Sequence, residues 1–177
     1  DEIVHGIPNE NPKILQEGDI VSLDLGLTHQ GLITDSAVTV GVGTISDDDR
    51  KMIEHCKEAL ARGIKVAQGG KHVGDIGHAI ESFISPLGYG LCEGLAGHGV
   101  GYKVHEDPFV PNYGRSGSGE LLKPGIVIAI EPMITQGTSR IVLARDGYTY
   151  KTADGSRACH CEHTIVITDR DPIILTK

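Results

Sequence analysis

Runs of apolar residues that alternate with polar ones recur along this chain and predict β-strands. Aliphatic and β-branched residues dominate these runs, which is the composition that strands favour. The runs lie near residues 2–5, 19–27, 32–42, 125–135, 140–145 and 159–168. A polar turn at His29-Gln30 separates the second run from the third, so these two runs are expected to form a hairpin.

Two helices are expected between the third and fourth strands. The first begins after Ser46, a residue that can cap it, and three aspartates follow where the helix dipole favours negative charge. Apolar residues then recur at helical spacing as far as Gly69-Gly70, and a second helix spans about 73–85. Mixed strands and helices indicate the α+β class.

Glycine-rich and polar segments fill the space before the fourth strand. Residues 93–101 are expected to form a glycine-rich turn that contains His98, and residues 111–125 a long loop.

An internal repeat joins the two ends of this pattern. ILQEGDIVSLD (14–24) aligns without gaps with LLKPGIVIAIE (121–131). Any turn followed by a buried strand would produce part of this likeness. The acid that ends both copies favours two related halves, each of which delivers a carboxylate to one shared site.

Composition and charge narrow the possible functions. The chain has 177 residues, which suits a single domain over 1–177, and 39% of them are hydrophobic. The net charge is −8 without a cluster of basic residues, which argues against nucleic acid and anionic membranes as partners. No apolar run approaches the ~20 residues needed to span a bilayer.

The cysteines favour neither a disulfide framework nor a zinc ribbon. There are four of them without a Cys-x-x-Cys motif, which indicates a reducing compartment. Alternation along the last strand places His160 on the face of Glu162, so Cys159 and Cys161 are expected to point away from it and to have a structural role.

The candidate chemistry begins with two aspartates in the hairpin, where strands disfavour them. If His29-Gln30 closes the hairpin, Asp24 and Asp35 lie directly opposite each other. Two carboxylates that close would either share a proton or hold a multivalent cation between them.

The remaining acids favour the cation. Glu131 and Glu162 also occupy strand positions, and His98 is flanked by glycines that allow a ligand to approach closely. Four carboxylates and one imidazole are too many ligands for a single four-coordinate zinc ion. They suit two ions that share bridging carboxylates, with Mn²⁺, Fe²⁺, Co²⁺ or Zn²⁺ as the candidates.

With these residues assembled, the chain resembles the type I methionine aminopeptidases over essentially its whole length. The motifs that carry the resemblance are VHGIP (4–8), DIVSLDLG with the downstream TDSA (19–37), GHGVGYKVHEDP (97–108), IAIEPM (128–133) and CEHTIVIT (161–168). The resemblance implies the pita-bread metallopeptidase fold, with a curved, mostly antiparallel sheet, helices on its outer face and pseudo-twofold halves. The family's residues before HGIP are missing from this sequence, so the first half is expected to be incomplete.

The resemblance also implies a role for each site residue. The metal ligands would be Asp24, Asp35, His98, Glu131 and Glu162, with Asp35 and Glu162 bridging two divalent ions. Glu131 would accept and transfer a proton, His105 would contact the scissile carbonyl group, and His5 the nitrogen of the scissile amide.

Two positions depart from the family pattern. Val104 replaces an aromatic residue, and Tyr148 replaces a tryptophan. The resemblance places both in the pocket for the methionine side chain.

The resemblance implies hydrolytic removal of the N-terminal methionine from nascent polypeptides or peptides. It further implies a cytoplasmic monomer in transient contact with the ribosome, with no role in binding nucleic acid or membranes. Two alternatives are a peptidase of the prolidase or aminopeptidase P kind, against which VHGIP argues, and a non-catalytic binding module of the same fold.

Overall fold

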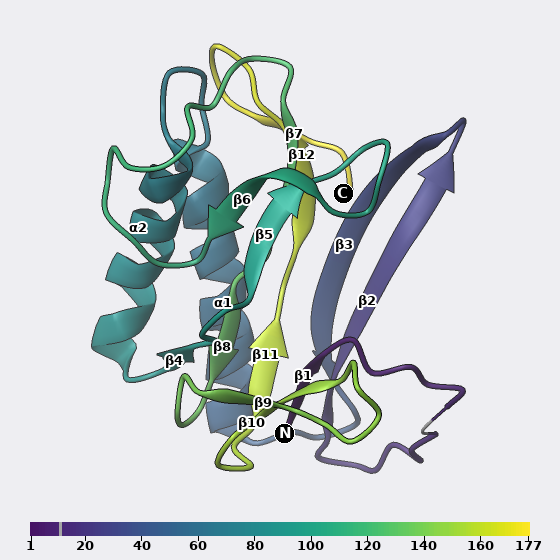
Figure 1. The fold of residues 1–177 in the computed structure, drawn as a ribbon. Helices are drawn as coiled ribbons and strands as arrows, with labels where there is room; N and C mark the ends of the chain where they lie inside the picture. Colours follow the sequence, from purple (N-terminus) through teal and green to yellow (C-terminus); the bar gives the residue numbers. More distant parts are fainter. Residues whose placement is uncertain (11) are drawn as a thin grey trace.

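Two helices lie side by side on one face of the molecule, and antiparallel strands make up the rest (Figure 1). The computed structural model describes residues 1–10 and 12–177. Helix α1 spans Asp47–Val66 and helix α2 spans Val73–Ile84, followed by the short 3₁₀ helix η1 at Ser85–Leu87. In the described part of the chain, neither long helix has the length and apolar character that crossing a membrane requires.

The ends of helix α1 match the signals in the sequence. The Ser46 side chain accepts a hydrogen bond from the amide of Asp49, as a helix cap does. The residue that caps the C-terminal end of the helix is Ala67, two residues before Gly69. Both expected helices are confirmed to within a residue or two.

The strands form several small antiparallel sheets. Strands β13, β12, β7, β5 and β6 make the largest sheet in that order; β11-β8-β4 and β1-β10-β9 make two smaller ones, and β2 pairs with β3 alone. Their bounds are Glu2–Val4 (β1), Ile20–His29 (β2), Leu32–Gly41 (β3), Gly90–Leu91 (β4), Ala96–Gly99 (β5), Glu106–Pro111 (β6), Val127–Ile130 (β7), Met133–Thr135 (β8), Ile141–Leu143 (β9), Tyr150–Thr152 (β10), Ala158–His160 (β11), His163–Val166 (β12) and Ile173–Ile174 (β13).

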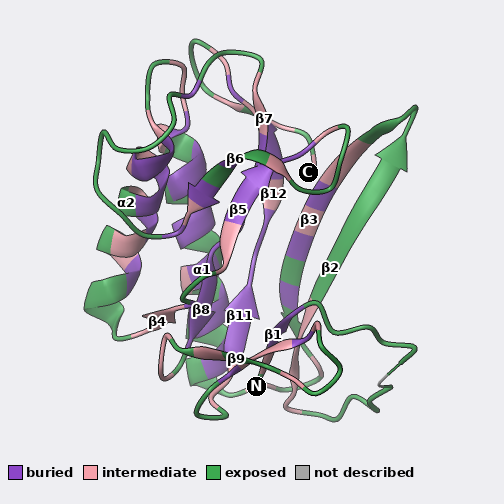
Figure 2. Ribbon diagram, in the orientation of Figure 1, coloured by how far each residue is buried: buried purple, intermediate pink, exposed green. Residues whose placement is uncertain are grey.

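The core lies between the helices and the strands that they cover (Figure 2). Helix α1 contributes Met52, Cys56 and Leu60 to it, while Ile128 and Ile165 come from β7 and β12. Burial of each large aliphatic side chain stabilises the fold by roughly 1.5–3 kcal/mol. This packing fixes the strands that carry the acidic residues on their opposite face.

The six expected strands are present, but two of them are broken and one expectation is wrong. The segment 125–135 splits into β7 and β8, and 159–168 splits into β11 and β12. His98 lies in strand β5 rather than in a glycine-rich turn. Glycine occupies every other position around His98, so the segment lacks the alternation of apolar and polar side chains that predicts a strand.

The pairing expected for the hairpin is also wrong. The turn is Gln30-Gly31, one residue further along, and both residues have positive φ (49° and 82°), as a type I′ turn requires. Asp24 therefore pairs with Ala37, and Asp35 pairs with Gly26. The two aspartates still share a face, but as diagonal neighbours rather than as opposite ones.

A directly opposed pair of acids exists in the second half instead. Strands β7 and β8 pair with β12 and β11 in one continuous register, from Val127↔Val166 to Ala158↔Thr135. At the break in this ladder the amide of Cys161 donates to the carbonyl oxygen of Pro132. Glu131 and Glu162 occupy opposite positions at the same break.

The repeat in the sequence corresponds to two strand corners with the same hydrogen bonds. In the first, Gly18 N–H donates to Val42 O and Val42 N–H donates to Asp19 O. In the second, the matching bonds join Gly125, Ile167 and Ile126. Gly18 and Gly125 have nearly equal positive φ, 90° and 93°. The two halves are therefore built alike, in keeping with the expected pseudo-twofold arrangement.

The outer face of the β2–β3 hairpin is apolar and exposed. Leu23, Leu25 and Leu27 alternate along β2 with half or more of their surface accessible, and β2 is exposed over most of its length (Figure 2). These leucines point away from the face that carries the aspartates, because side chains alternate along a strand.

Substitution of Gly125 tests the repeated corner. Gly125→Ala forces a Cβ into the left-handed region at φ 93° and should lower the free energy of unfolding by about 1–2 kcal/mol, measured by urea denaturation. Gly26→Ala is the control, because Gly26 is in a strand with ordinary contacts and no positive φ, and it should be neutral or slightly stabilising. Equal stabilities of the two variants would contradict this account of the corner.

Candidate metal centre

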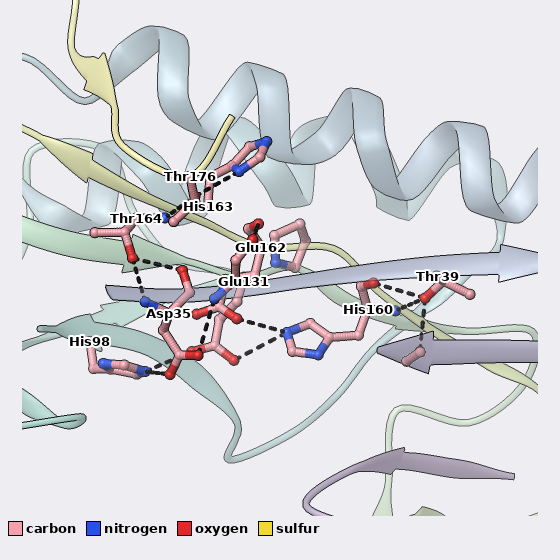
Figure 3. A network of polar contacts seen from close by, with 12 residues as sticks. Asp35, Thr39, His98, Glu131, His160, Glu162, His163, Thr164 and Thr176 are labelled. Atoms are coloured by element: carbon pink, nitrogen blue, oxygen red, sulfur yellow. Dashed lines mark hydrogen bonds and ion pairs between the residues drawn. The ribbon is translucent and has the colours of Figure 1, made fainter. Parts of the chain in front are cut away.

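Four side chains from separate strands meet in one buried group (Figure 3). Asp35 comes from β3, His98 from β5, Glu131 follows β7, and Glu162 precedes β12. Each is 8% exposed or less. One ligand atom each from Asp35, His98 and Glu162 lie within 4.8 Å of one another, a group able to hold a metal ion. Residues that are 127 positions apart in the sequence thus share one site.

His98 is aimed into this group by its own strand. Its Nδ1 lies 2.9 Å from the carbonyl oxygen of Gly99, and because a carbonyl only accepts, Nδ1 carries the proton. Nε2 points toward the acids and lies 3.3 Å from Oε1 of Glu131 and 4.0 Å from Oδ2 of Asp35. An imidazole held through Nδ1 by a backbone carbonyl, with Nε2 directed at two carboxylates, is a donor set suited to a divalent cation.

The glycines on both sides of His98 are needed for close packing. A Cβ at Gly97 would collide with the carbonyl oxygen of Ala129, and a Cβ at Gly99 with that of Asp107. Only glycine lets β5 approach its neighbours here.

Threonine side chains join the strand of Asp35 to the strand of Glu162. The hydroxyl of Thr164 accepts from the amide of Asp35 at 2.8 Å and donates to the carbonyl oxygen of the same residue at 2.7 Å. The amide of Glu162 donates to Ala37 O at 2.8 Å. These bonds, not a β-ladder, hold the two acids beside each other.

Glu131 lies between two imidazoles. Its Oε1 faces Nε2 of His98, and its Oε2 lies 3.4 Å from Nε2 of His160. Asn112 donates to its main-chain oxygen at 3.0 Å and fixes the backbone. The prediction that His160 shares the face of Glu162 is confirmed, because His160 Nε2 also lies 4.0 Å from Glu162 Oε2.

Asp24 lies at the open side of the group. The residue is exposed as a whole, but burial of its carboxyl group raises its pKa, and the negative charges of Asp35 and Glu131 act in the same direction. Its carboxyl group is therefore close enough to the others to feel their repulsion.

Glu162 is the most deeply buried acid of the group. Burial and, after it, the charges of the neighbouring carboxylates raise the pKa of Glu162 to about 10. Its Oε1 has no hydrogen-bond partner in the described part of the chain. A buried carboxyl group in this state is stabilised by a cation, so the donor set fits the divalent ions that the sequence indicates.

Two further histidines flank the group. The ring of His105 lies 4.3 Å from that of His98, between centroids, and burial together with His98 lowers the pKa of His105. His5 follows β1 with φ 67° and packs edge-on against Tyr150 at 5.8 Å.

The two positions that depart from the family pattern lie in loops. Val104 is exposed between β5 and β6, next to His105. Tyr148 lies between β9 and β10, and its hydroxyl donates to Glu10. This hydrogen bond raises the pKa of Tyr148 to about 12.

The cysteines lie on the other side of the strands. Cys56, Cys159 and Cys161 are buried in the core with their sulfur atoms within 4.8 Å of one another, and all four cysteines are free thiols. Burial raises the pKa of Cys56 well above its ordinary value, so this thiol is protonated at neutral pH.

Comparison with known proteins places these features in a family. The model of metallopeptidase family M24 matches residues 1–169. The chain belongs to metallopeptidase family M24.

Several M24 relatives carry the same name. The chain is 42% identical to methionine aminopeptidase 1 of Bacillus subtilis (strain 168) over 177 residues, which are 100% of this chain and 71% of the relative. The crystal structure of methionine aminopeptidase from Thermotoga maritima superposes with a TM-score of 0.95 at 44% identity, covering 99% of this chain and 70% of that one. These matches confirm the resemblance stated from the sequence motifs, the pita-bread fold and the identity as a peptidase.

A second branch of the M24 structures is more distant. Prolidase from Pyrococcus horikoshii OT3 has a TM-score of 0.73 at 30% identity and covers 93% of this chain and 42% of that one. The fold is shared, but the sequence is closer to the methionine aminopeptidases.

The raised pKa of Glu162 predicts how the stability of the metal-free chain depends on pH. The folded value of about 10 exceeds the ordinary 4.5, so the stability that this group contributes is complete below about pH 4.5 and is lost as the pH rises through about 10. Between about pH 5 and about pH 8 the free energy of unfolding should fall by about 2–4 kcal/mol.

A comparison of variants isolates this effect. Glu162→Gln should remove most of the fall, while the exposed Glu54→Gln should retain it, both measured by urea denaturation in a chelating buffer. If Glu162→Gln kept the full pH dependence, the repulsion assigned to this carboxyl group would be refuted.

Proposed function

We propose that the chain removes methionine from the N-terminus of polypeptides by metal-dependent hydrolysis. The observation that carries the proposal is the buried cluster of carboxylates around Glu162, a donor set that a divalent cation would stabilise. The substrate is inferred from the relatives named methionine aminopeptidase, which match the whole chain at about 40% identity.

The metal ions would be held by the residues that the sequence motifs indicate. These are Asp24, Asp35, His98, Glu131 and Glu162, with Asp35 and Glu162 shared between two ions of Mn²⁺, Fe²⁺, Co²⁺ or Zn²⁺. Divalent ions bound in this way acidify water and polarise a carbonyl group.

Glu131 is the residue proposed to move the proton. Its carboxylate is buried and keeps both oxygens within 3.4 Å of an imidazole nitrogen. As a general base it would accept a proton from the attacking water and deliver it to the departing amine. Its main chain is held by a hydrogen bond from the Asn112 side chain.

His105 and His5 would bind the scissile amide. Because its pKa is lowered, His105 is neutral at pH 7 and can donate an N–H to the carbonyl oxygen as negative charge develops there. His5 would accept a hydrogen bond from the N–H of the scissile amide.

A pocket beside His98 could receive the substrate. It has a volume of about 800 Å³ and is lined by His98, His105 and the exposed aromatic rings of Tyr102 and Phe109. Val104 and Tyr148 are proposed to contact the methionine side chain in addition to the residues that line this pocket. An aliphatic valine in place of an aromatic ring would leave more room for that side chain.

The cellular context is part of the proposal. We infer a monomer that acts in the cytoplasm on nascent chains, in transient contact with the ribosome. The single catalytic domain would extend over residues 1–177, and the chain spans 71% of the length of the Bacillus subtilis relative.

Metal removal and substrate choice test the proposal together. The metal-loaded chain should cleave Met-Ala-Ser, lose that activity in EDTA and recover it when Mn²⁺ or Co²⁺ is added. Cleavage is measured by chromatography of the free methionine released. Faster cleavage of X-Pro dipeptides would favour the prolidase alternative. A folded chain that binds no metal ions would favour the non-catalytic binding module.

Substitution of Glu131 tests the proton transfer. Glu131→Gln keeps the shape of the side chain but cannot accept a proton, and it should lower kcat by about 10²–10⁴-fold. The exposed Glu120→Gln should leave kcat unchanged. Near-normal kcat in Glu131→Gln, with the bound metal measured in the same sample, would exclude Glu131 as the base.

A further inference from the structure

His160 has a buried imidazole that the proposed function leaves without a task. The residue is 1% exposed, and neither ring nitrogen has a hydrogen-bond partner that meets standard geometry in the described part of the chain. A buried polar group without a partner costs roughly 1–3 kcal/mol. A ring kept in this position at that cost indicates a role in the neighbouring site.

The pseudo-twofold arrangement relates the position of His160 to that of a proposed metal ligand. Superposing the two corners pairs Val42 with Ile167, the residues that make the matching hydrogen bonds. Seven residues before Val42 is Asp35, and seven before Ile167 is His160. His160 is thus the counterpart, in the second half, of a proposed metal ligand in the first.

The backbone of His160 is held firmly. The hydroxyl of Thr39 accepts from its amide at 2.9 Å and donates to its carbonyl oxygen at 2.8 Å (Figure 3). The hydroxyl of Thr164 holds the backbone of Asp35 by the same pattern of two hydrogen bonds. The two counterparts are therefore anchored alike, each by one threonine.

We propose that His160 is a positioning residue that donates its Nε2–H to Oε2 of Glu131. Glu131 is then held between His160 on one oxygen and His98 on the other, at 3.4 Å and 3.3 Å. The inference rests on the proposed function, since Glu131 is the proposed base. It differs from ligation because His160 lies outside the group of ligand atoms that Asp35, His98 and Glu162 form, and its Nε2 lies 3.4 Å from Oε2 of Glu131, which accepts hydrogen bonds when ionised.

The chemistry of such a contact is general. Carboxylates that bind metal ions are oriented by hydrogen bonds from residues behind them, and loss of such a residue typically costs about 10–100-fold in metal affinity or activity. A fixed Glu131 would also keep its free lone pair directed at the water that it deprotonates.

Two variants of the whole chain test the proposal. His160→Leu fills a similar volume without a donor and should weaken Mn²⁺ binding by about 10–100-fold and lower kcat by a similar factor, with KM within about twofold. His160→Gln keeps an N–H donor and should restore both quantities to within about fivefold of the unaltered chain. Binding is measured by calorimetry and kcat with Met-Ala-Ser.

His163 provides a matched control at the start of the next strand, β12. Its Nδ1 lies 2.9 Å from the hydroxyl of Thr176, away from the acids, so His163→Leu should leave Mn²⁺ affinity unchanged. If His160→Leu binds Mn²⁺ and turns over like the unaltered chain, the proposal fails. If His160→Gln is as defective as His160→Leu, the donor role fails and direct ligation is indicated instead.

A measurement on the unaltered chain covers the case in which a variant does not fold. Nitrogen-15 NMR of the chain loaded with diamagnetic Zn²⁺ should show Nε2 of His160 protonated and bonded to hydrogen, and a metal-shifted Nε2 would overturn the proposal. Neither metal affinity nor this spectrum depends on turnover. An unaltered chain that lacks aminopeptidase activity would therefore contradict the proposed function alone.

Discussion

The structure depends on holding several carboxylates together where they repel one another. Glu162 shows the scale of this constraint, because burial and its acidic neighbours raise its pKa to about 10. Carboxylates in such a group are stable as ions only around positive charge, and the side chains nearest to them are imidazoles rather than lysine or arginine. The fold therefore has to bring the acids together before a cation binds, and the cation then removes the repulsion.

The backbone meets this constraint with two similar hairpins. Each begins with a glycine corner at φ near 90° and places an acid six residues after that glycine, Asp24 in one and Glu131 in the other. Threonine side chains then tie the two hairpins to each other without a shared ladder. Helices α1 and α2 cover the far side of the second hairpin, so its strands are fixed from behind by the core. Rigid support of this kind is what a preorganised site requires.

Much of this could be predicted from the sequence because its signals are local. The Ser46 cap and the helical spacing after it depend on neighbouring residues alone, and both helices were placed within a residue or two. Alternation likewise placed His160 and Glu162 on one face and Cys159 and Cys161 on the other. The acids stood out because they lie within or beside strand-like runs, and strands disfavour them.

What could not be predicted depends on contacts that are distant in the sequence or on very short segments. The register of the hairpin depends on whether Gln30 adopts a positive φ. Glycine at position 31 is compatible with this conformation of Gln30 but does not determine it. Strand β5 carries glycine at alternate positions, so it has no hydrophobic pattern to detect; its strand form comes from pairing with β6 and β7. Strands β4 and β13, of two residues each, are likewise defined by their partners.

The most direct test of the central claim is anomalous X-ray scattering from crystals of the chain grown with Mn²⁺. The account predicts two anomalous peaks, both enclosed by Asp24, Asp35, His98, Glu131 and Glu162, with Asp35 and Glu162 touching both ions. Crystals in which the carboxylates keep this arrangement and no anomalous peak lies among them would contradict it.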